Sequence, residues 1–212
     1  MKLLRTLIAT GLCLAFAAPA LAQQERTIRF GHLNNTDHPI SFGVKKFAEI
    51  ISAKSGGKIK VQEYPANQLG SELQQQSALQ GGVQQMSLPA TTSLAGIVKE
   101  FGLIDFPFAV SNFEQADALL DGPFGKALLD KLPEKGLVAL GYWDLGFRNV
   151  TNSKHPVNKP EDLQGLKIRV IPNPVFLETF KAFNANPVPL SFSELYSACL
   201  LYTSPSPRDV EE

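Results

Sequence analysis

The segment that decides the fold spans residues 141–196 and reads GYWDLGFRNVTNSKHPVNKPEDLQGLKIRVIPNPVFLETFKAFNANPVPLSFSELY. Its arginines Arg148 and Arg169 each lie in or beside a short run with the composition of a β-strand. A link rich in proline and glycine joins the runs, so the pattern predicts two adjacent strands that present both guanidinium groups to one cleft. A guanidinium is a planar fork that fits a carboxylate bidentately. We therefore hypothesise that this segment captures a small organic acid; the alternative is two solvated surface charges or ion pairs.

Composition narrows the class of protein. The chain has 212 residues, of which 44% are hydrophobic, as in a globular protein with a real core. It carries 20 basic and 20 acidic side chains, so nothing favours a nucleic-acid or anionic-membrane partner. No group of His, Cys, Asp and Glu has metal-ligand spacing, and we expect neither a metal nor a cofactor.

The N-terminus has the pattern of a signal peptide. Lys2 and Arg5 provide a positive start, residues 7–21 are mostly apolar or small, and residues 20–22 read Ala-Leu-Ala. The pattern predicts a signal peptide over residues 1–22, cleavage after Ala22, and an exported protein that is released from the membrane.

The C-terminus is unusual. Cys199 would be a lone thiol in an exported protein. The segment that begins there, CLLYTSPSPRD, resembles a translated sequencing adapter. We expect residues 199–212 to be a non-native tail; the alternative is a natural disordered tail.

Between these ends, strand and helix patterns alternate, which predicts a parallel α/β fold. The predicted strands cover residues 27–32, 58–64, 86–90, 137–142, 147–151, 166–171 and 187–190. The predicted helices cover residues 40–55, 71–80, 111–120, 124–132, 174–183 and 191–198. Residues 101–110 are apolar but contain a proline, and we expect them to be buried outside a central strand.

Helix-start signals refine these predictions. Thr36 or Asp37 is expected to cap the first helix, whose apolar face is predicted from Phe42, Phe47, Ile50 and Ile51. Serines open three later helices, and two of these starts have the capping-box pattern. The three are Ser71, Ser111 and Ser191.

Taken in order, the motifs FGH, DHP, GGKIKV, YPANQLGSE, FPF, GFRNVTNS, PEDLQGLKIRV and NPVPLSFSELY resemble the DctP-type solute-binding proteins of tripartite ATP-independent periplasmic (TRAP) transporters. The resemblance covers residues 27–198. It implies an α/β fold of the periplasmic binding protein type II-like class, in which two lobes with central β-sheets flanked by helices close on an organic acid. We place lobe I at residues 23–144 and the start of lobe II at residues 145–198.

The resemblance also implies ligand-binding residues. Arg169 falls on the main carboxylate clamp of the family and Arg148 on a second ligand contact. Glu72 matches an acidic position after QLG, and Phe192 resembles a pocket-wall position. Trp143 lies just before the expected hinge and is a candidate for the upper wall.

Three further residues are candidates for the pocket. His32 ends a predicted strand and is as well explained by a structural role as by the cleft, and Asn34 and Asn173 are candidate pocket residues. Each of the other candidates has a plain alternative too: Glu72 as a first-turn helix residue, and Trp143 and Phe192 as core.

The chain also departs from the family pattern. Members usually follow ELYxAL with a D-G-x-E-N segment and then continue, whereas this chain switches to CLLYTSPSPRD. We therefore expect an incomplete second lobe.

The resemblance implies a monomeric, non-enzymatic periplasmic protein that captures a carboxylate, sugar acid or dicarboxylate for the membrane permease subunits of a TRAP transporter. Two alternatives stay open. One is a periplasmic enzyme acting on an organic acid, although neither G-x-S-x-G nor H-E-x-x-H occurs. The other is a ligand-sensing partner of a membrane receptor.

Overall fold

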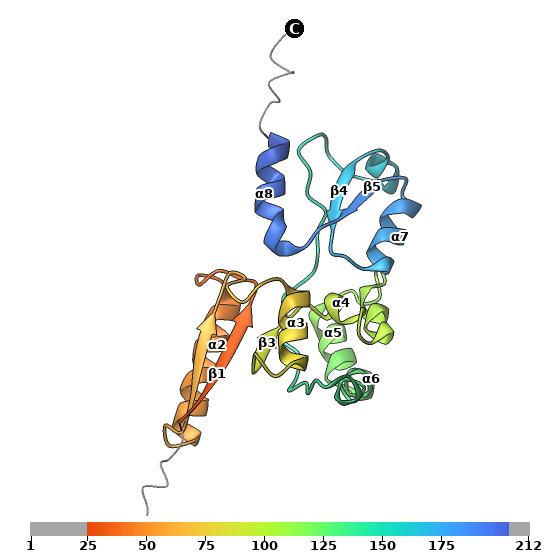
Figure 1. Ribbon diagram of the computed structural model, residues 1–212. Helices are drawn as coiled ribbons and strands as arrows, with labels where there is room; N and C mark the ends of the chain where they lie inside the picture. Colours follow the sequence, from red (N-terminus) through yellow and green to blue (C-terminus); the bar gives the residue numbers. More distant parts are fainter. Residues whose placement is uncertain (1–24, 204–212) are drawn as a thin grey trace, which may run out of the picture.

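The computed structural model describes residues 25–203, which form two lobes, each with a parallel sheet of its own (Figure 1). The expected signal peptide lies outside the described residues, as do residues 204–212 of the expected tail. The strands are β1 (Arg26–His32), β2 (Ile59–Tyr64), β3 (Met86–Leu88), β4 (Lys167–Val170) and β5 (Asn186–Pro189). The α-helices are α2 (Pro39–Lys54), α3 (Glu72–Gln80), α4 (Thr91–Leu94), α5 (Phe113–Leu120), α6 (Pro123–Leu129), α7 (Pro174–Ala182) and α8 (Phe192–Thr203). The 3-10 helices are η1 (Lys99–Asp105), η2 (Pro133–Lys135) and η3 (Pro160–Leu163).

The N-terminal lobe, β1 to η2, is built on a three-stranded sheet in the order β2-β1-β3. Strand β1 runs parallel to both neighbours, with Ile28 opposite Val61 and Gly31 opposite Ser87. Helix α2 makes the crossover between β1 and β2 that a parallel pair requires. This arrangement confirms the predicted parallel α/β class and the strands expected at residues 27–32, 58–64 and 86–90.

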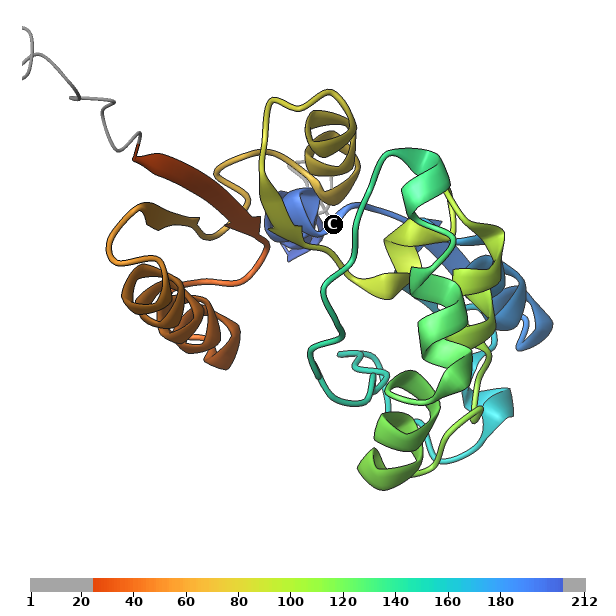
Figure 2. The same ribbon diagram turned by 90° about the horizontal axis from the view of Figure 1, so that it is seen from below.

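Helices cover both faces of this sheet (Figure 2). Phe30 is 2% exposed and packs with Val44 and Phe47 of α2. Gly31 points the other way, because successive strand residues alternate between faces. A Cβ at Gly31 would lie 2.3 Å from Oε1 of Gln75 in α3 and 2.8 Å from Nε2 of Gln84, so the glycine leaves room for these two buried side-chain amides.

Helix α2 corrects two predictions. Its N-cap is His38, whose Nδ1 accepts a hydrogen bond from Ile40 N at 3.1 Å, so neither Thr36 nor Asp37 caps it. The buried stripe is set by Ile40 and Val44, whereas Phe42 and Ile50 are 59% and 43% exposed. The prediction is right at Phe47, which packs on this core, and wrong at Phe42 and Ile50, because a helix with apolar residues on several sides does not itself say which side meets the sheet.

A second core in the N-terminal lobe surrounds Phe101, which is fully buried with Val98, Leu128 and Leu132. The prediction that residues 101–110 are buried is therefore right at its start and wrong further on. Phe106 and Phe108 are 54% and 92% exposed, because the chain turns outward after η1.

The C-terminal lobe repeats the same local plan on a smaller scale. Parallel strands β4 and β5 are joined by α7, with Arg169 opposite Val188. Leu163, Leu166 and Ala185 form its buried core. The extended and helical patterns predicted here are confirmed.

Residues 137–152, between the lobes, contain no regular secondary structure, and both strands predicted there are wrong. Apolar alternation alone does not make a strand, because the backbone groups must pair with a neighbouring strand. The neighbour of β4 is β5, so Arg148 and Arg169 do not lie on adjacent strands as expected.

The helix caps are partly as predicted. Ser71 and Gln74 form the capping box of α3, and Ser191 precedes α8. Helix α5 starts one residue later than expected, because its N-cap is Asn112, not Ser111. Helix α8 continues to Thr203, through the start of the expected tail. Over residues 25–203 no helix has the length and apolar character needed to span a bilayer.

Candidate functional site

Arg169 is half-buried on β4, and its side chain is anchored at one point. Its Nε donates a hydrogen bond of 2.9 Å to the carbonyl oxygen of Leu190, the residue after β5. Within residues 25–203 no hydrogen bond or ion pair is found for its two terminal Nη groups. The guanidinium is thus held in place by one donor while its forked end is free to bind a guest.

The electrostatic surroundings of Arg169 favour a bound anion. Burial lowers the pKa of its guanidinium, the positive charge of Arg148 lowers it further, and Glu72 raises it. A half-buried cation that is repelled by a second cation is stabilised when a negative charge enters.

Arg148 approaches this site from the irregular segment between the lobes. It is exposed, and its guanidinium carbon lies 6.0 Å from the ring centre of Phe176 in α7, within cation–π range. Its charge acts on both Arg169 and Glu72. The structure therefore brings the two arginines and Glu72 into one electrostatic cluster, although it does so without the predicted strand pair.

Glu72 opens α3 and is itself held by the backbone. Its Oε1 accepts a hydrogen bond of 2.6 Å from Ala90 N. Burial raises the pKa of the carboxyl above its ordinary value of 4.5, although the Ala90 N–H and the charges of Arg148 and Arg169 act in the opposite direction. Glu72 is thus fixed beside the arginines, with one oxygen available to a ligand hydroxyl.

Asn34 and Phe192 meet at a hollow of about 290 Å³. The loop after β1 supplies most of its wall and the start of α8 supplies the rest. Its lining consists of Asn34, Asn35, Asp37, His38, Pro39 and Phe192. Arg169 is tied to the same region, because Leu190, which accepts its Nε–H, lies two residues before Phe192. The hollow has polar groups suited to sugar hydroxyls beside one aromatic ring.

Trp143 lies against the N-terminal lobe. Its ring contacts Phe30 at 6.3 Å between centroids, edge to face, and crowds Gly43, where a Cβ would lie 2.9 Å from Cζ3. It is 39% exposed. In this arrangement it closes one end of the α2 core, and the structure does not bring it together with the arginines.

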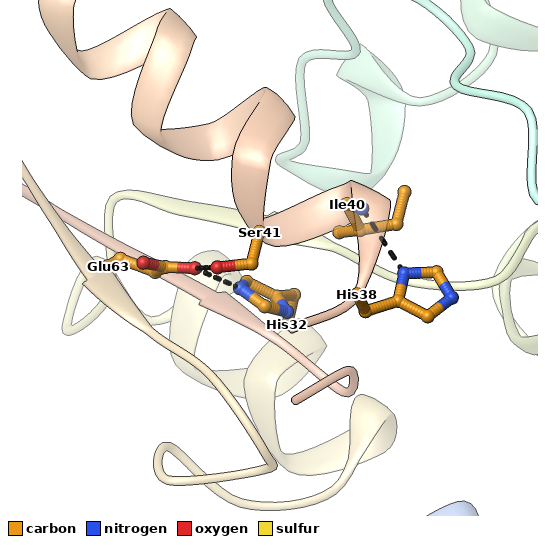
Figure 3. Close-up of polar contacts among 5 residues, drawn as sticks. All are labelled: His32, His38, Ile40, Ser41 and Glu63. Carbon is orange, nitrogen blue, oxygen red and sulfur yellow. Dashed lines mark hydrogen bonds and ion pairs between the residues drawn. The ribbon is translucent and has the colours of Figure 1, made fainter. Parts of the chain in front are cut away.

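His32 takes part in a separate buried cluster (Figure 3). It is 1% exposed, and its Nε2 lies 2.9 Å from Oε1 of Glu63, which also accepts a short hydrogen bond from Ser41 Oγ. Burial would raise the pKa of Glu63, but the hydrogen bonds from Ser41 and His32, with the charges of His32 and Lys45, outweigh burial and lower it. The cluster ties β1, β2 and α2 together inside the lobe.

Asn173 is buried, with 2% exposure, at the start of α7. Its Oδ1 accepts from Val175 N at 2.8 Å and caps α7. Its Nδ2 donates to Thr92 O at 3.1 Å and to Asp105 Oδ2 at 3.0 Å, both in the N-terminal lobe.

Several residues near these groups were not predicted. Phe176 contacts Arg148, Asp105 contacts Asn173, and Ser41 shares the Glu63 carboxylate with His32. Folding brings these residues together, and the local sequence gave no signal for them. The Asn-Pro pair at the start of α7 was a readable signal, since asparagine prefers the N-cap and proline the first turn. Among residues 25–203 no group of His, Cys, Asp and Glu is arranged to hold a metal ion.

Comparisons with known proteins agree with the geometry. Residues 30–199 match the family described as bacterial extracellular solute-binding protein, family 7 (DctP). The 2,3-diketo-L-gulonate-binding periplasmic protein YiaO of Escherichia coli K12 is 36% identical over 183 residues, which cover 86% of this chain and 55% of that protein.

Solved structures show the same fold. The sugar acid binding protein DctPAm of Advenella mimigardefordensis, in complex with galactonate, superimposes with a TM-score of 0.82 at 43% identity, over 85% of this chain and 58% of that one. A TRAP periplasmic solute-binding protein of Sulfurospirillum deleyianum with bound succinate gives 0.79 at 36% identity, over 82% and 56%. The chain thus spans little more than half the length of the relatives it matches.

Proposed function

This chain belongs to the DctP family of bacterial extracellular solute-binding proteins, and on that premise we propose that it captures an organic carboxylate for a TRAP-type transporter. The observation that carries the proposal is the cluster of Arg169, Arg148 and Glu72. Arg169 is half-buried, anchored through Nε and repelled by Arg148, so its free Nη groups form a ready clamp for a carboxylate.

One clamp does not account for useful affinity by itself. Two charge-assisted hydrogen bonds at about 1.5–3 kcal/mol each supply about 3–6 kcal/mol, whereas micromolar binding needs about 8 kcal/mol. Further contacts from Arg148, from Glu72 and from the hollow beside Phe192 are needed to supply the rest.

The lining of the hollow favours a sugar acid over a dicarboxylate. Asn34, Asn35 and His38 offer hydrogen bonds to hydroxyl groups, while Asp37 would repel a second carboxylate. Both classes of ligand occur among the similar structures, one of which holds galactonate and another succinate. We expect galactonate to bind this chain more tightly than succinate does.

The same premise gives the setting. Proteins of this family are periplasmic and work with membrane permease subunits, and we propose the same place and partners for this chain, acting as a monomer. The family consists of substrate-binding proteins, so we expect this chain to release its acid chemically unchanged.

Calorimetric titration of the purified chain with galactonate, glucuronate and succinate tests the proposal. Galactose and glucose serve as matched sugars without a carboxylate. We expect galactonate to bind and galactose to give no heat of binding, and we expect NMR of the recovered acid to show no turnover. If galactonate and galactose gave the same heat of binding, the proposed carboxylate clamp would be wrong. A chemical change in the acid would favour the enzyme alternative.

A further inference from the structure

A buried polar bridge joins the two lobes at the start of α7. Figure 1 shows this end of α7 against the region of α4 and η1. The side-chain amide of Asn173 crosses between the lobes and donates both of its protons, to Thr92 O at 3.1 Å and to Asp105 Oδ2 at 3.0 Å. Asn173 and Asp105 are 2% and 9% exposed, so water competes little for these bonds.

Asp105 is committed to this bridge through both of its oxygens. Its Oδ1 accepts a hydrogen bond of 2.7 Å from Thr92 Oγ1, and its Oδ2 accepts from Asn173. Burial raises the pKa of Asp105 above its ordinary value of 3.8, although Thr92, the charge of Arg148 and Asn173 act in the opposite direction. A buried carboxylate whose partner is removed is costly, so the bridge favours one arrangement of the two lobes.

Apolar packing beside the bridge is equally close. A Cβ at Gly102 of η1 would lie 3.5 Å from Cγ2 of Val175 in α7, so the Val175 side chain lies close to the backbone of η1. The first turn of α7 is therefore seated on η1 by packing and located by hydrogen bonds.

The position of the bridge in the chain links it to the arginine cluster. Asn173 follows Arg169 by only four residues, across the end of β4. Fixing Asn173 against the N-terminal lobe therefore limits how far Arg169 moves from Glu72, which α3 and Ala90 hold in that lobe.

We propose that Asn173 is a positioning residue: its amide fastens the C-terminal lobe to Asp105 and Thr92, and so sets the distance between Arg169 and Glu72. Asn173 does this by orienting the lobes, without touching the ligand. This role goes beyond the carboxylate binding proposed above, and its first test involves no ligand.

The test measures the distance between two spin labels, one on each lobe, by pulsed electron paramagnetic resonance. Labels go on Lys54→Cys and Glu161→Cys, both exposed, with Cys13 and Cys199 replaced by serine. The decisive variant is Asn173→Asp, which keeps the acceptor that caps α7 but loses the amide donor and places a second carboxylate against Asp105. We expect a longer and broader distance distribution than in the parent chain.

Two further variants make the test specific. The double variant Asp105→Asn with Asn173→Asp restores one donor and one acceptor in the reverse direction, and we expect the narrow distribution to return. Ser93→Ala removes a neighbouring buried hydroxyl that bonds only Gln76 and Ala90 within the N-terminal lobe, and we expect the distance to stay unchanged. Where Asn173→Asp does not fold by circular dichroism, Asn173→Ser replaces it, because serine keeps a capping oxygen without adding charge.

The outcomes separate the two proposals. An unchanged distance in folded Asn173→Asp or Asn173→Ser overturns the positioning role, as does a reversed pair that stays broad. Titration of the same variants with galactonate then measures the consequence for capture, where we expect about tenfold weaker binding. Failure of the parent chain to bind galactonate would contradict the proposed function and leave the distance result standing.

Discussion

Glu63 and Glu72 stand at the two ends of one loop, yet their environments are opposite. Glu63 is the last residue but one of β2 and accepts hydrogen bonds from His32 and Ser41, which lower its pKa. Glu72 begins a helix, and burial raises its pKa in spite of the nearby Arg148 and Arg169. In the first cluster the protein itself supplies the partners of the carboxylate. In the second, the Nη groups of Arg169 keep donors that no group of the described residues 25–203 accepts, and on this difference we base the proposal that it binds the ligand.

The largest effect is expected from Arg169→Ala. Losing both clamp hydrogen bonds costs about 3–6 kcal/mol, so affinity for galactonate should fall by about 100-fold or more, as measured by calorimetric titration. Arg26→Ala, on the exposed start of β1, is the matched control and should bind as the parent does. If Arg169→Ala bound galactonate with the affinity of the parent, the cluster around Arg169 would not be the carboxylate site.

The next largest effect is expected from Glu63→Gln, which changes the carboxylate that His32 and Ser41 hydrogen-bond inside the lobe. We expect a loss of about 2 kcal/mol in the free energy of unfolding at pH 7, from hydrogen bonds to a charged acceptor. Urea denaturation measures it, and Glu49→Gln, in an exposed ion pair with Lys46, should change stability by less than about 0.5 kcal/mol.

The pH dependence of Glu63→Gln follows from the direction of the pKa shift. Because the folded pKa of Glu63 lies below the ordinary 4.5, its contribution to stability is complete above pH 4.5 and is lost as pH falls through the folded pKa. The difference between the parent and Glu63→Gln should therefore shrink on acidification. A difference that stays constant from pH 7 to pH 3 would show that the ionised form has no special role.

Arg148→Ala should have a smaller effect on binding than Arg169→Ala. Arg148 is exposed and rests on Phe176 through a single cation–π contact, so its loss should weaken galactonate binding about tenfold, or about 1.4 kcal/mol. Thermal unfolding of the same variant should stay close to that of the parent. A loss as large as that of Arg169→Ala would make the two arginines equal partners in the clamp.

The smallest effect, and one of opposite sign, is expected from Glu72→Gln. The folded pKa of Glu72 is raised, so its ionised form destabilises the folded state at pH 7, and this cost is relieved as pH falls through the folded pKa toward 4.5. We expect Glu72→Gln to be more stable than the parent by up to about 1 kcal/mol at pH 7. This gain in stability should disappear near pH 4.5. If Glu72→Gln were less stable than the parent at pH 7, the ionised carboxylate of Glu72 would stabilise the fold as that of Glu63 does.

Local sequence signals predicted much of the fold. The alternation around Ile28 and Val61 and the Gly56-Gly57 break between helix and strand predicted the first βαβ unit, because these signals are local. The strands predicted at residues 137–142 and 147–151 failed because pairing is not local. The same limit explains α2, where the sequence offered several apolar stripes and the sheet selected the one through Val44.

The candidate site shows the same division between what the local sequence predicts and what only folding determines. The sequence by itself determined which residue types could grip an acid, since Arg148, Arg169 and Glu72 carry the chemistry wherever they lie. Only the tertiary structure decided that these three share one electrostatic environment, that His32 is engaged by Glu63, and that Asn173 fastens one lobe to the other. The reason is physical: charge and hydrogen-bonding capacity belong to a side chain, whereas burial and the choice of partner depend on which distant segments fold against it.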